Sequence, residues 1–215
     1  MYDPIIFDLD GTLLNTLGDL AAAGNHALEK FGFPAHETEE YRYFVGNGIP
    51  RLIERICPNG SDAETRALVH KAFSEYYALH KADLTKPYPG MTELLSELHA
   101  RGITAVCNTN KDHKFSEELL RSFYGENLVE IIGAGLGYER KPDPAAALYL
   151  TKRYAKKCEK PLYVGDSGVD MQTAQNAGIE ACGVLWGFRE REELEAFKPA
   201  HIAANVGELR QIIGL

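Results

Sequence analysis

Residues 5–16 read IIFDLDGTLLNT, an apolar run that ends in two carboxylates and a glycine. The run at residues 5–7 is typical of a strand that is buried on both faces of a parallel sheet. Asp8 and Asp10 follow it at once. Two such carboxylates repel each other and lose hydration, so they need a cation or a shared proton beside them. This stretch therefore predicts a buried strand with a charged site at its carboxyl end.

The sequence after Asn15 changes from strand-like to helical spacing. Apolar residues recur at helical intervals from Leu17 to Phe31, and residues 16–19, TLGD, have the form of a helix N-cap with an acid three residues later. Further helical pieces are predicted over Glu37–Tyr43, Ile49–Ile56 and Asp62–Lys81. Because nothing here resembles a buried strand, we interpret residues 15–83 as a helical insertion whose two ends lie close in space.

The segment KPYPG at residues 86–90 ends this helical region, because each proline restricts itself and the residue before it. Strands and helices then alternate. Helices are predicted over Thr92–Arg101, over Ser116–Phe123, from an N-cap at Asp143-Pro144 to about Lys157, and up to Gly178; strands are predicted at 103–107, 129–135, 162–166 and 179–186. Such alternation predicts a parallel sheet covered on both faces. The predicted fold class is α/β, with a Rossmann-like core at 1–14 and 84–215 and a helical cap at 15–83.

The composition is that of a globular chain with an acidic balance. Its 215 residues are 45% hydrophobic and 25% charged, with a formal net charge of −8. This charge argues against nucleic acid or an anionic membrane as a partner, because both need a basic surface. No apolar run approaches a membrane span, and the first residues lack the basic start and cleavage site of a secretion signal. We expect a cytoplasmic protein, as a monomer or a small homo-oligomer.

Other cofactor motifs are not supported by the spacing. The four cysteines include no C-x-x-C pair, so neither a zinc site nor a disulfide framework is indicated for Cys57, Cys107, Cys158 and Cys182. The stretch GAGLGY at 133–138 lacks the third glycine of a dinucleotide fingerprint. A calcium loop starting at Asp8 fails, because Thr12, Leu13 and Asp19 stand at its fifth, sixth and twelfth positions.

Three further polar clusters follow predicted strands. They are Thr109-Asn110-Lys111, Lys141-Pro142-Asp143-Pro144, and Gly165-Asp166-Ser167 with Asp170 after it. In an open parallel sheet the carboxyl ends of the strands define the crevice where ligands bind, so these clusters should converge on Asp8 and Asp10. Each cluster alone is ordinary, and their joint occurrence in this order indicates a functional site.

The converging carboxylates predict a magnesium site. Asp8 and Asp166 would hold Mg²⁺, which accepts one or two carboxylates, several waters and a substrate phosphate. Asp170 lies four residues after Asp166 on the same helical face, where it assists directly or orients the site through water. Lys141 and Lys111 would offset the remaining negative charge as a phosphate approaches.

These segments, in this order and with a helical insertion after the first, resemble the haloacid dehalogenase superfamily of phosphotransferases. Three stretches are similar to its phosphoglycolate phosphatase branch: DLDGTLLNT with DLAAA at 8–23, FVGNGIPRLIE at 44–54, and KPYPGMTELLSELHARGITAVCNTNK at 86–111. The resemblance in motifs reaches from Phe7 to Asp170. Asn15 departs from the pattern, because it stands where this branch usually has an acid.

The resemblance implies distinct roles for the four aspartates. Asp8 would be the nucleophile that takes the phosphoryl group as an aspartyl phosphate. Asp10 would protonate the leaving alcohol, later activate water, and give its backbone carbonyl to the metal. Asp166 would complete the metal site, and Asp170 would support it.

The resemblance also places residues around the substrate. Thr109 and Lys141 would bind the phosphoryl oxygens, with Asn110 beside them and backbone N–H groups of the following helix start assisting. In the cap, Gly48 and Arg51 are candidates to contact the rest of the substrate. Arg51, beside GNGIP, either holds a substrate carboxylate or is a solvated surface arginine, and both interpretations stay open.

The sequence thus predicts a Mg²⁺-dependent phosphatase that acts on a small phosphomonoester, with 2-phosphoglycolate as the leading candidate. The cap would close over the substrate and hinge near residues 14–16 and 84–89. Two alternatives stay open: a sugar-phosphate mutase of the β-phosphoglucomutase kind, which keeps both aspartates, and a non-catalytic phosphate-binding module on the same fold. A dehalogenase is disfavoured, since it has no use for Asp10 or a metal.

Overall fold

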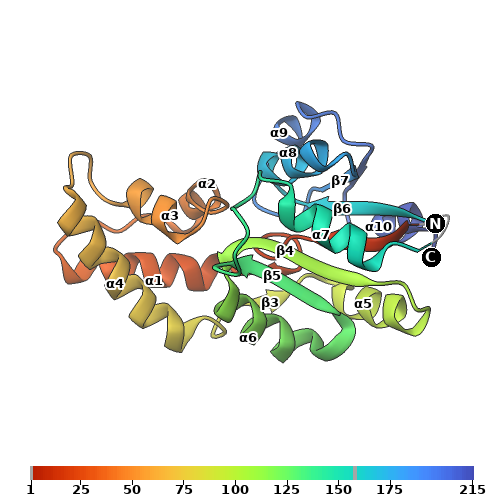
Figure 1. Ribbon diagram of the computed structural model, residues 1–215. Coiled ribbons are helices and arrows are strands. Elements are labelled where there is room, and N and C mark those ends of the chain that lie inside the picture. Colours follow the sequence, from red (N-terminus) through yellow and green to blue (C-terminus); the bar gives the residue numbers. More distant parts are fainter. Residues whose placement is uncertain (1, 157–158) are drawn as a thin grey trace.

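The computed structural model describes residues 2–156 and 159–215 (Figure 1). Within them, six parallel strands form one sheet in the order β5-β4-β1-β6-β7-β8. The strands are β1 (Tyr2–Phe7), β4 (Ala105–Asp112), β5 (Glu130–Ala134), β6 (Lys160–Gly165), β7 (Glu180–Val184) and β8 (His201–Ala203). The chain starts in the middle, moves outward through β4 and β5, and returns to β6 on the other side of β1. A ligand crevice is expected at this reversal, outside the carboxyl ends of β1 and its neighbours.

Helices cover both faces of the sheet, as the alternation predicts. One face packs against α5 (Met91–Ala100), α6 (His113–Tyr124) and α10 (Val206–Ile213); the other packs against α7 (Ala145–Tyr154), α8 (Gly168–Ala177) and α9 (Arg191–Glu195). Successive residues of β1 point to opposite faces, so Ile5 and Phe7 belong to the first layer and Ile6 to the second. All three are fully buried, and each such side chain contributes about 1.5–3 kcal/mol of transfer free energy.

Four helices lie to one side of the sheet and form the cap (Figure 1). They are α1 (Leu17–Lys30), α2 (Tyr41–Phe44), α3 (Ile49–Ile56) and α4 (Ala63–His80), with a short 3₁₀ helix at Thr38–Glu40. Their apolar faces share one hydrophobic cluster, in which Leu28, Tyr41 and Tyr77 are fully buried. The cap therefore has a core of its own, while its predicted limits at 15–83 stay a prediction.

The two ends of the cap are joined by a short ribbon. β2 (Leu14–Asn15) pairs antiparallel with β3 (Lys86–Pro87). The buried carboxylate of Asp19 ties the same ends together: it accepts the backbone N–H of Leu84 at 2.9 Å, and the N–H and hydroxyl of Thr85 at 2.8 and 2.6 Å. The ends of the insertion are thus close in space, and a hinge at this ribbon stays a prediction.

The N-cap of α1 lies at Thr16, as predicted, with Asp19 in the first turn, but the side chains of both residues have other partners. Thr16 does occupy the N-cap position, but its side chain makes no capping hydrogen bond. Its hydroxyl instead donates to Asp10 Oδ1 at 2.6 Å. Asp19, the expected capping acid, accepts hydrogen bonds from Leu84 and Thr85 at the other end of the insertion. Both side chains of the predicted N-cap motif, Thr16 and Asp19, therefore hydrogen-bond to groups outside α1.

Other predicted boundaries differ by a few residues. α4 agrees with the prediction, since Asp62 caps it by accepting the Thr65 N–H at 2.7 Å. The predicted helix from Asp143 to about Lys157 has its N-cap at Pro144 and ends at Tyr154; Lys157 lies outside the described residues. The strand predicted at 103–107 continues to Asp112 as β4. Thr109 therefore lies inside a strand rather than after one.

Two expectations from composition can be compared with the structure. In the part of the chain that the structure describes, Cys57, Cys107 and Cys182 are buried free thiols. Cys158 lies outside the described residues. Among the described helices, none combines the length and the apolar character that crossing a membrane requires.

Candidate active site

A tight turn after β1 positions both aspartates of the opening stretch. The carbonyl of Leu9 accepts the N–H groups of Thr12, Leu13 and Leu14 at 3.2, 3.0 and 3.1 Å, which folds residues 9–14 back on themselves. Gly11 in this turn has φ +90°, and a Cβ there would lie 2.1 Å from Asp166 Oδ2. The glycine after Asp10 is therefore required twice, by its backbone conformation and by the close approach of a second carboxylate.

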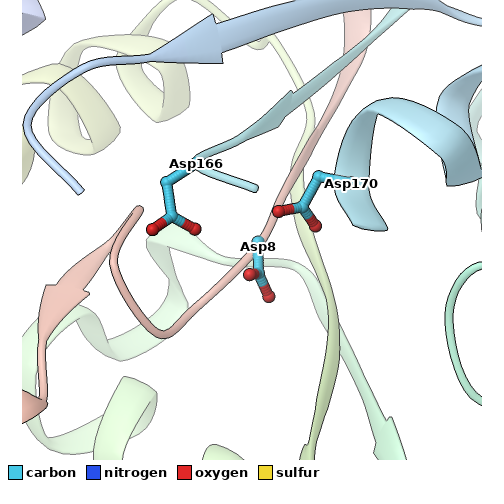
Figure 2. Close-up of side chains that lie close together, drawn as sticks. All are labelled: Asp8, Asp166 and Asp170. Carbon is cyan, nitrogen blue, oxygen red and sulfur yellow. The ribbon is translucent and has the colours of Figure 1, made fainter. Parts of the chain in front are cut away.

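Three aspartates from three different elements meet at the carboxyl edge of the sheet (Figure 2). Asp8 follows β1, Asp166 follows β6, and Asp170 lies in the first turn of α8. Each offers a carboxylate oxygen, and these oxygens all lie within 4.8 Å of one another. All three side chains are buried. The convergence predicted from the sequence is thus present in the geometry.

Lys141 is the cation that lies among these carboxylates. Its Nζ is 2.7 Å from Asp8 Oδ1 and 2.7 Å from Asp170 Oδ1, and the residue is 5% exposed. We call Asp8, Asp166, Asp170 and Lys141 the acid cluster. Burial alone would lower the pKa of Lys141, but the carboxylates of Asp170 and Asp8 raise it well above its usual range. The lysine is therefore held charged, and it pairs with two of the three carboxylates, while the charge of Arg189 acts on Asp166 from farther away.

Burial and mutual repulsion raise the pKa values of two aspartates in the acid cluster. Burial, followed by repulsion from Asp170, raises the pKa of Asp8 to about 7. Burial, with repulsion from Asp170 and Asp8, also raises the pKa of Asp166 well above its usual range. Buried carboxylates are tolerated when they are paired or bind a metal. A cation beside Asp8 and Asp166 would supply the missing charge.

The hydrogen bonds of the acid cluster indicate which oxygens are available to a cation. Asp170 accepts from Lys141 Nζ at 2.7 Å through Oδ1, and from the N–H and hydroxyl of Ser167 at 3.1 and 2.6 Å through Oδ2. Asp8 Oδ1 lies 2.7 Å from Lys141 Nζ, and Asp166 accepts the Phe188 N–H at 2.7 Å through Oδ2. An oxygen-only donor set of this kind fits a hard divalent cation such as Mg²⁺. Among the described residues, no hydrogen bond is found to Asp8 Oδ2 or to Asp166 Oδ1, whereas both oxygens of Asp170 are occupied by Lys141 and Ser167. Asp8 and Asp166 therefore each keep one oxygen for a cation, and fit the role of ligands better than Asp170.

Asp10 lies in a different environment from Asp8. Its Oδ1 accepts from Lys111 Nζ at 3.0 Å and from the Thr16 hydroxyl at 2.6 Å. The Lys111 ammonium also lies 4.7 Å from the ring centroid of Tyr77, which comes from α4 of the cap. Burial would lower the pKa of Lys111, but Asp10 and Tyr77 raise it above its usual range. Asp10 thus has one charged and one neutral donor of its own.

A cavity of about 370 Å³ opens between the aspartates and the cap. Its core side is lined by Asp8, Asp10, Thr109, Asn110 and Lys111, and its cap side by Leu20, Val45, Gly46, Gly48, Ile49 and Leu52. It is polar at the carboxyl edge of the sheet and mostly apolar toward the cap. A small anionic ligand would therefore meet charge at one end and an apolar wall at the other.

Two predicted substrate-binding residues have other partners. The side-chain amide of Asn110 donates to the carbonyls of Gly46 and Lys141 at 3.0 and 3.2 Å and accepts the Lys141 N–H at 2.8 Å. Asn110 therefore holds the Lys141 backbone and joins it to the cap. Arg51 is exposed, is paired with Glu54, and lines a neighbouring cleft rather than the 370 Å³ cavity. The roles assigned to both residues stay predictions.

Sequence reasoning did not find two groups of contacts at this site. The pairing of Asp10 with Thr16 has no signal in a local motif, because the threonine fits an N-cap equally well. Gly187 and Phe188 also reach the acid cluster, since the Phe188 N–H donates to Asp166 Oδ2 at 2.7 Å. Both residues follow β7 at the same edge of the sheet as the other clusters, and this position could have predicted that they lie near the site.

Comparison with known proteins extends over nearly the whole chain. The family model for haloacid dehalogenase-like hydrolases matches residues 5–184. The phosphoglycolate phosphatase of Vibrio parahaemolyticus is 35% identical over 218 residues, which cover 98% of this chain and 96% of that protein. The phosphoglycolate phosphatase of Pseudomonas putida is 34% identical over 215 residues, 97% of this chain and 78% of the other. The crystal structure of a predicted phosphoglycolate phosphatase from Haemophilus somnus has a TM-score of 0.90 at 28% identity, with 99% and 98% of the two chains covered.

Proposed function

The chain belongs to the haloacid dehalogenase-like hydrolase family, and we propose that it is a Mg²⁺-dependent phosphatase that hydrolyses a small phosphomonoester through an aspartyl phosphate. The observation that carries this proposal is the acid cluster, in which three buried carboxylates share one lysine. A bound cation would reduce the repulsion among these buried carboxylates and could also bind a phosphate group. The names of the relatives support phosphomonoester chemistry.

The nucleophile in this proposal is Asp8. Its carboxylate attacks phosphorus, the bond to the leaving alcohol breaks, and the phosphoryl group becomes bound to Asp8. Lys141 and the Thr109 hydroxyl bind the phosphoryl oxygens, where negative charge builds up in the transition state. Their position supports this role, because Lys141 Nζ already lies 2.7 Å from an Asp8 oxygen and Thr109 lines the same cavity.

Asp10 moves the protons. It gives a proton to the leaving alcohol oxygen, and it then takes one from the water that attacks the aspartyl phosphate, so that inorganic phosphate leaves and both aspartates are restored. Lys111 and Thr16 hold the carboxylate in one orientation while it does this. The separate partners of the two aspartates support their separate roles.

Asp8 and Asp166, with the backbone carbonyl of Asp10, would hold the Mg²⁺. When bound, the ion neutralises charge on the carboxylates and on the transferring phosphoryl group, which lets two anions approach each other. Asp170 would keep Lys141 and Ser167 in place beside it, and we expect it to reach the ion through water, since both its oxygens are hydrogen-bonded.

We propose 2-phosphoglycolate as the leading substrate, acted on in the cytoplasm. The relatives named phosphoglycolate phosphatase support this choice, as does a cavity that has charged residues at its core end for a small anion. Gly48, which lines the cavity, would contact the part of the substrate that leaves; Arg51, which lines a neighbouring cleft, would reach a substrate carboxylate only after leaving Glu54. The cap closes the cavity and excludes water from the site.

A phosphate-release screen tests this function. Purified protein is assayed on a panel of phosphorylated metabolites and on p-nitrophenyl phosphate, with Mg²⁺ and then with excess chelator. We expect release of inorganic phosphate that depends on Mg²⁺ and is highest for 2-phosphoglycolate. Activity that survives excess chelator would contradict the metal role. Isomerisation of a hexose phosphate without phosphate release would identify a mutase instead.

The aspartyl phosphate has its own test. Protein quenched in acid during turnover is digested, and the peptide that contains Asp8 is examined by mass spectrometry. We expect one added phosphoryl group on this peptide in the wild type and none in Asp8→Asn. A phosphoryl group on another residue would overturn the assignment of the nucleophile.

A further inference from the structure

Four consecutive residues after β7 contact both the acid cluster and the cap. They are Trp186, Gly187, Phe188 and Arg189, and we call them the bridge segment. They belong to no helix or strand. Gly187, Phe188 and Arg189 each contact one or both of these regions, and Trp186 contacts the turn after Asp8, so the segment lies between the predicted metal ligands and the helices that cover them.

On the core side, the bridge segment packs against Asp166 and the turn after Asp8. The Phe188 N–H donates to Asp166 Oδ2 at 2.7 Å. A Cβ at Gly187 would lie 2.4 Å from the same oxygen and 2.5 Å from the Gly11 carbonyl, so only glycine allows this approach. The Trp186 indole donates to the Thr12 carbonyl at 3.1 Å. The segment therefore fixes one face of the Asp166 carboxylate.

On the cap side, the same residues are held by α2 and its C-terminal end. Arg42 donates to the Gly187 carbonyl through Nη2 at 2.8 Å and to the Phe188 carbonyl through Nε at 3.3 Å. Arg189 donates to the carbonyls of Arg42 and Val45, the latter at 2.8 Å. The Phe188 ring lies in the hydrophobic cluster of the cap, where it is 5% exposed. The cap and the bridge segment are thus in direct contact through both polar and apolar groups.

One peptide group connects Arg42 to Asp166. The carbonyl of Gly187 and the N–H of Phe188 belong to the same peptide unit, which is trans and therefore points its two polar groups in opposite directions. Arg42 donates to the carbonyl of this unit, and the N–H of the unit donates to Asp166. A cationic donor at the carbonyl polarises the peptide and strengthens its N–H as a donor. The guanidinium of the cap thus acts on the Asp166 carboxylate through one rigid plane.

We propose that Arg42 is a positioning residue that couples closure of the cap to cation binding at Asp166. The inference rests on the proposed function, because it takes Asp166 as a ligand of Mg²⁺. When the cap moves away, Arg42 leaves the carbonyls of Gly187 and Phe188, the Phe188 ring loses its packing in the cap cluster, and the Gly187–Phe188 peptide loses the donor that orients it. Asp166 is then held less precisely, and the affinity for the cation falls. By linkage, the bound cation favours the closed cap by the same factor.

A second connection reinforces the first. Glu193 in α9 accepts the Gly168 N–H at 2.9 Å through Oε1 and pairs with Arg189 Nε at 3.3 Å through Oε2. Gly168 is the first residue of α8, the helix that carries Asp170. Arg189, which donates to two carbonyls of the cap, is therefore also connected through Glu193 to the first residue of α8, beside the acid cluster. Cap position is thus linked to two sides of the proposed cation site.

The test measures Mg²⁺ binding without substrate, by isothermal titration calorimetry. Arg42→Gln removes the donor to both carbonyls and is expected to weaken Mg²⁺ binding about tenfold, as loss of a group that orients a metal ligand does. Arg121→Gln is the matched control, because Arg121 also donates to two backbone carbonyls, those of Gly125 and Leu128, at the far end of α6. It should bind Mg²⁺ as the wild type does. Equal affinity of wild type and Arg42→Gln would overturn the proposal.

Trp186 gives a second readout that does not depend on turnover. It is the single tryptophan of the chain and lies in the bridge segment. We expect Mg²⁺ to change its fluorescence in the wild type, and a higher Mg²⁺ concentration to be needed for the same change in Arg42→Gln. If this variant does not fold, Arg42→Lys decides, because an ammonium has no fixed fork for two carbonyls and should leave binding at least about threefold weaker.

One further variant separates the two proposals. Asp166→Asn should remove most of the Mg²⁺ binding if Asp166 is a ligand. If Asp166→Asn loses Mg²⁺ binding while Arg42→Gln binds Mg²⁺ as well as the wild type does, the coupling is refuted and the proposed function stands. Wild-type protein that binds no Mg²⁺ would refute both.

Discussion

The surroundings of Asp8 and of Asp10 differ in charge balance, although only Leu9 separates the two residues. Asp8 shares Lys141 with Asp170 and lies beside Asp166, so among the described residues one lysine is in direct contact with this group of three carboxylates. Asp10 has Lys111 and the Thr16 hydroxyl to itself. The first group is short of positive charge and the second is not.

The difference follows from how the chain places neighbouring side chains. Leu9 is fully buried in the core, and the turn behind it directs Asp8 toward β6 and α8 while Asp10 faces β4 and the cap. A motif with two acids thus gives one carboxylate that needs a cation and one that has its counter-charge built in. Four variants test this difference between the two aspartates.

Asp8→Asn should change activity and stability in opposite directions. We expect the rate of p-nitrophenyl phosphate hydrolysis to fall by at least ~10⁴-fold, because the nucleophile is gone. In excess chelator, the thermal midpoint should equal or exceed that of the wild type, since one of three mutually repelling carboxylates has been removed. Scanning calorimetry measures the midpoint. A midpoint clearly below the wild type would show that Asp8 is already compensated without a metal.

Lys141→Met should lower both activity and stability. The acid cluster loses its only lysine, so in chelator we expect destabilisation of about 3–5 kcal/mol, the usual effect of breaking a buried ion pair. The value of kcat should fall about 10²–10³-fold, as for other lost contacts to a transition-state charge. Denaturant unfolding and steady-state kinetics measure the two effects.

Lys160→Met is the control for this variant. Lys160 also pairs with a carboxylate, that of Glu180 at 3.1 Å, but its side chain is 74% exposed and lies far from the active site. Exposed pairs contribute about 0–1 kcal/mol, so little should change in stability or kcat. A similar loss of stability in both variants would contradict the claim that the acid cluster is short of positive charge.

The prediction of the fold from the sequence succeeded where hydrophobic periodicity decides the structure. Residues 5–7 and the later apolar runs do form parallel strands with helices on both faces, because burial of an apolar face dominates the choice of element. The prediction failed where a polar side chain had two possible partners. Thr16 and Asp19 match a capping box, yet they bind Asp10 and the far end of the cap, which no local pattern specifies.

The same distinction applies to the candidate site. The meeting of Asp8, Asp166 and Asp170 could be predicted, because all three follow strands of one parallel sheet and its carboxyl edge brings them together. The contacts of the bridge segment to Asp166 could not be predicted, because the backbone of Gly187 and Phe188 makes them. Backbone contacts do not depend on residue type, apart from the one position where only glycine fits.

Lys111→Met should affect activity more than stability. Asp10 loses its charged donor but keeps the Thr16 hydroxyl, and its side chain is 13% exposed, so water can partly replace the lysine. We expect a loss of about 1–3 kcal/mol in unfolding free energy and a fall of about 10–100-fold in kcat, as general acid–base catalysis loses its orientation. In an Asp10→Asn background the same change should cost far less in kcat, which a double-mutant cycle measures. Equal costs in both backgrounds would show that Lys111 acts on something other than Asp10.

Thr16→Val should give the smallest effect, because it removes one neutral hydrogen bond and keeps the shape of the side chain. The expected loss in unfolding free energy is about 0.5–1.5 kcal/mol, and kcat should fall about tenfold or less, since Lys111 still holds the same Asp10 oxygen. Thr173→Val is the matched control: its buried hydroxyl donates to the Val169 carbonyl at 2.7 Å within α8. Both variants should lose similar stability, while only Thr16→Val lowers kcat. If kcat falls equally in both, the Thr16 hydroxyl supports the fold alone, and Lys111 by itself sets the orientation of Asp10.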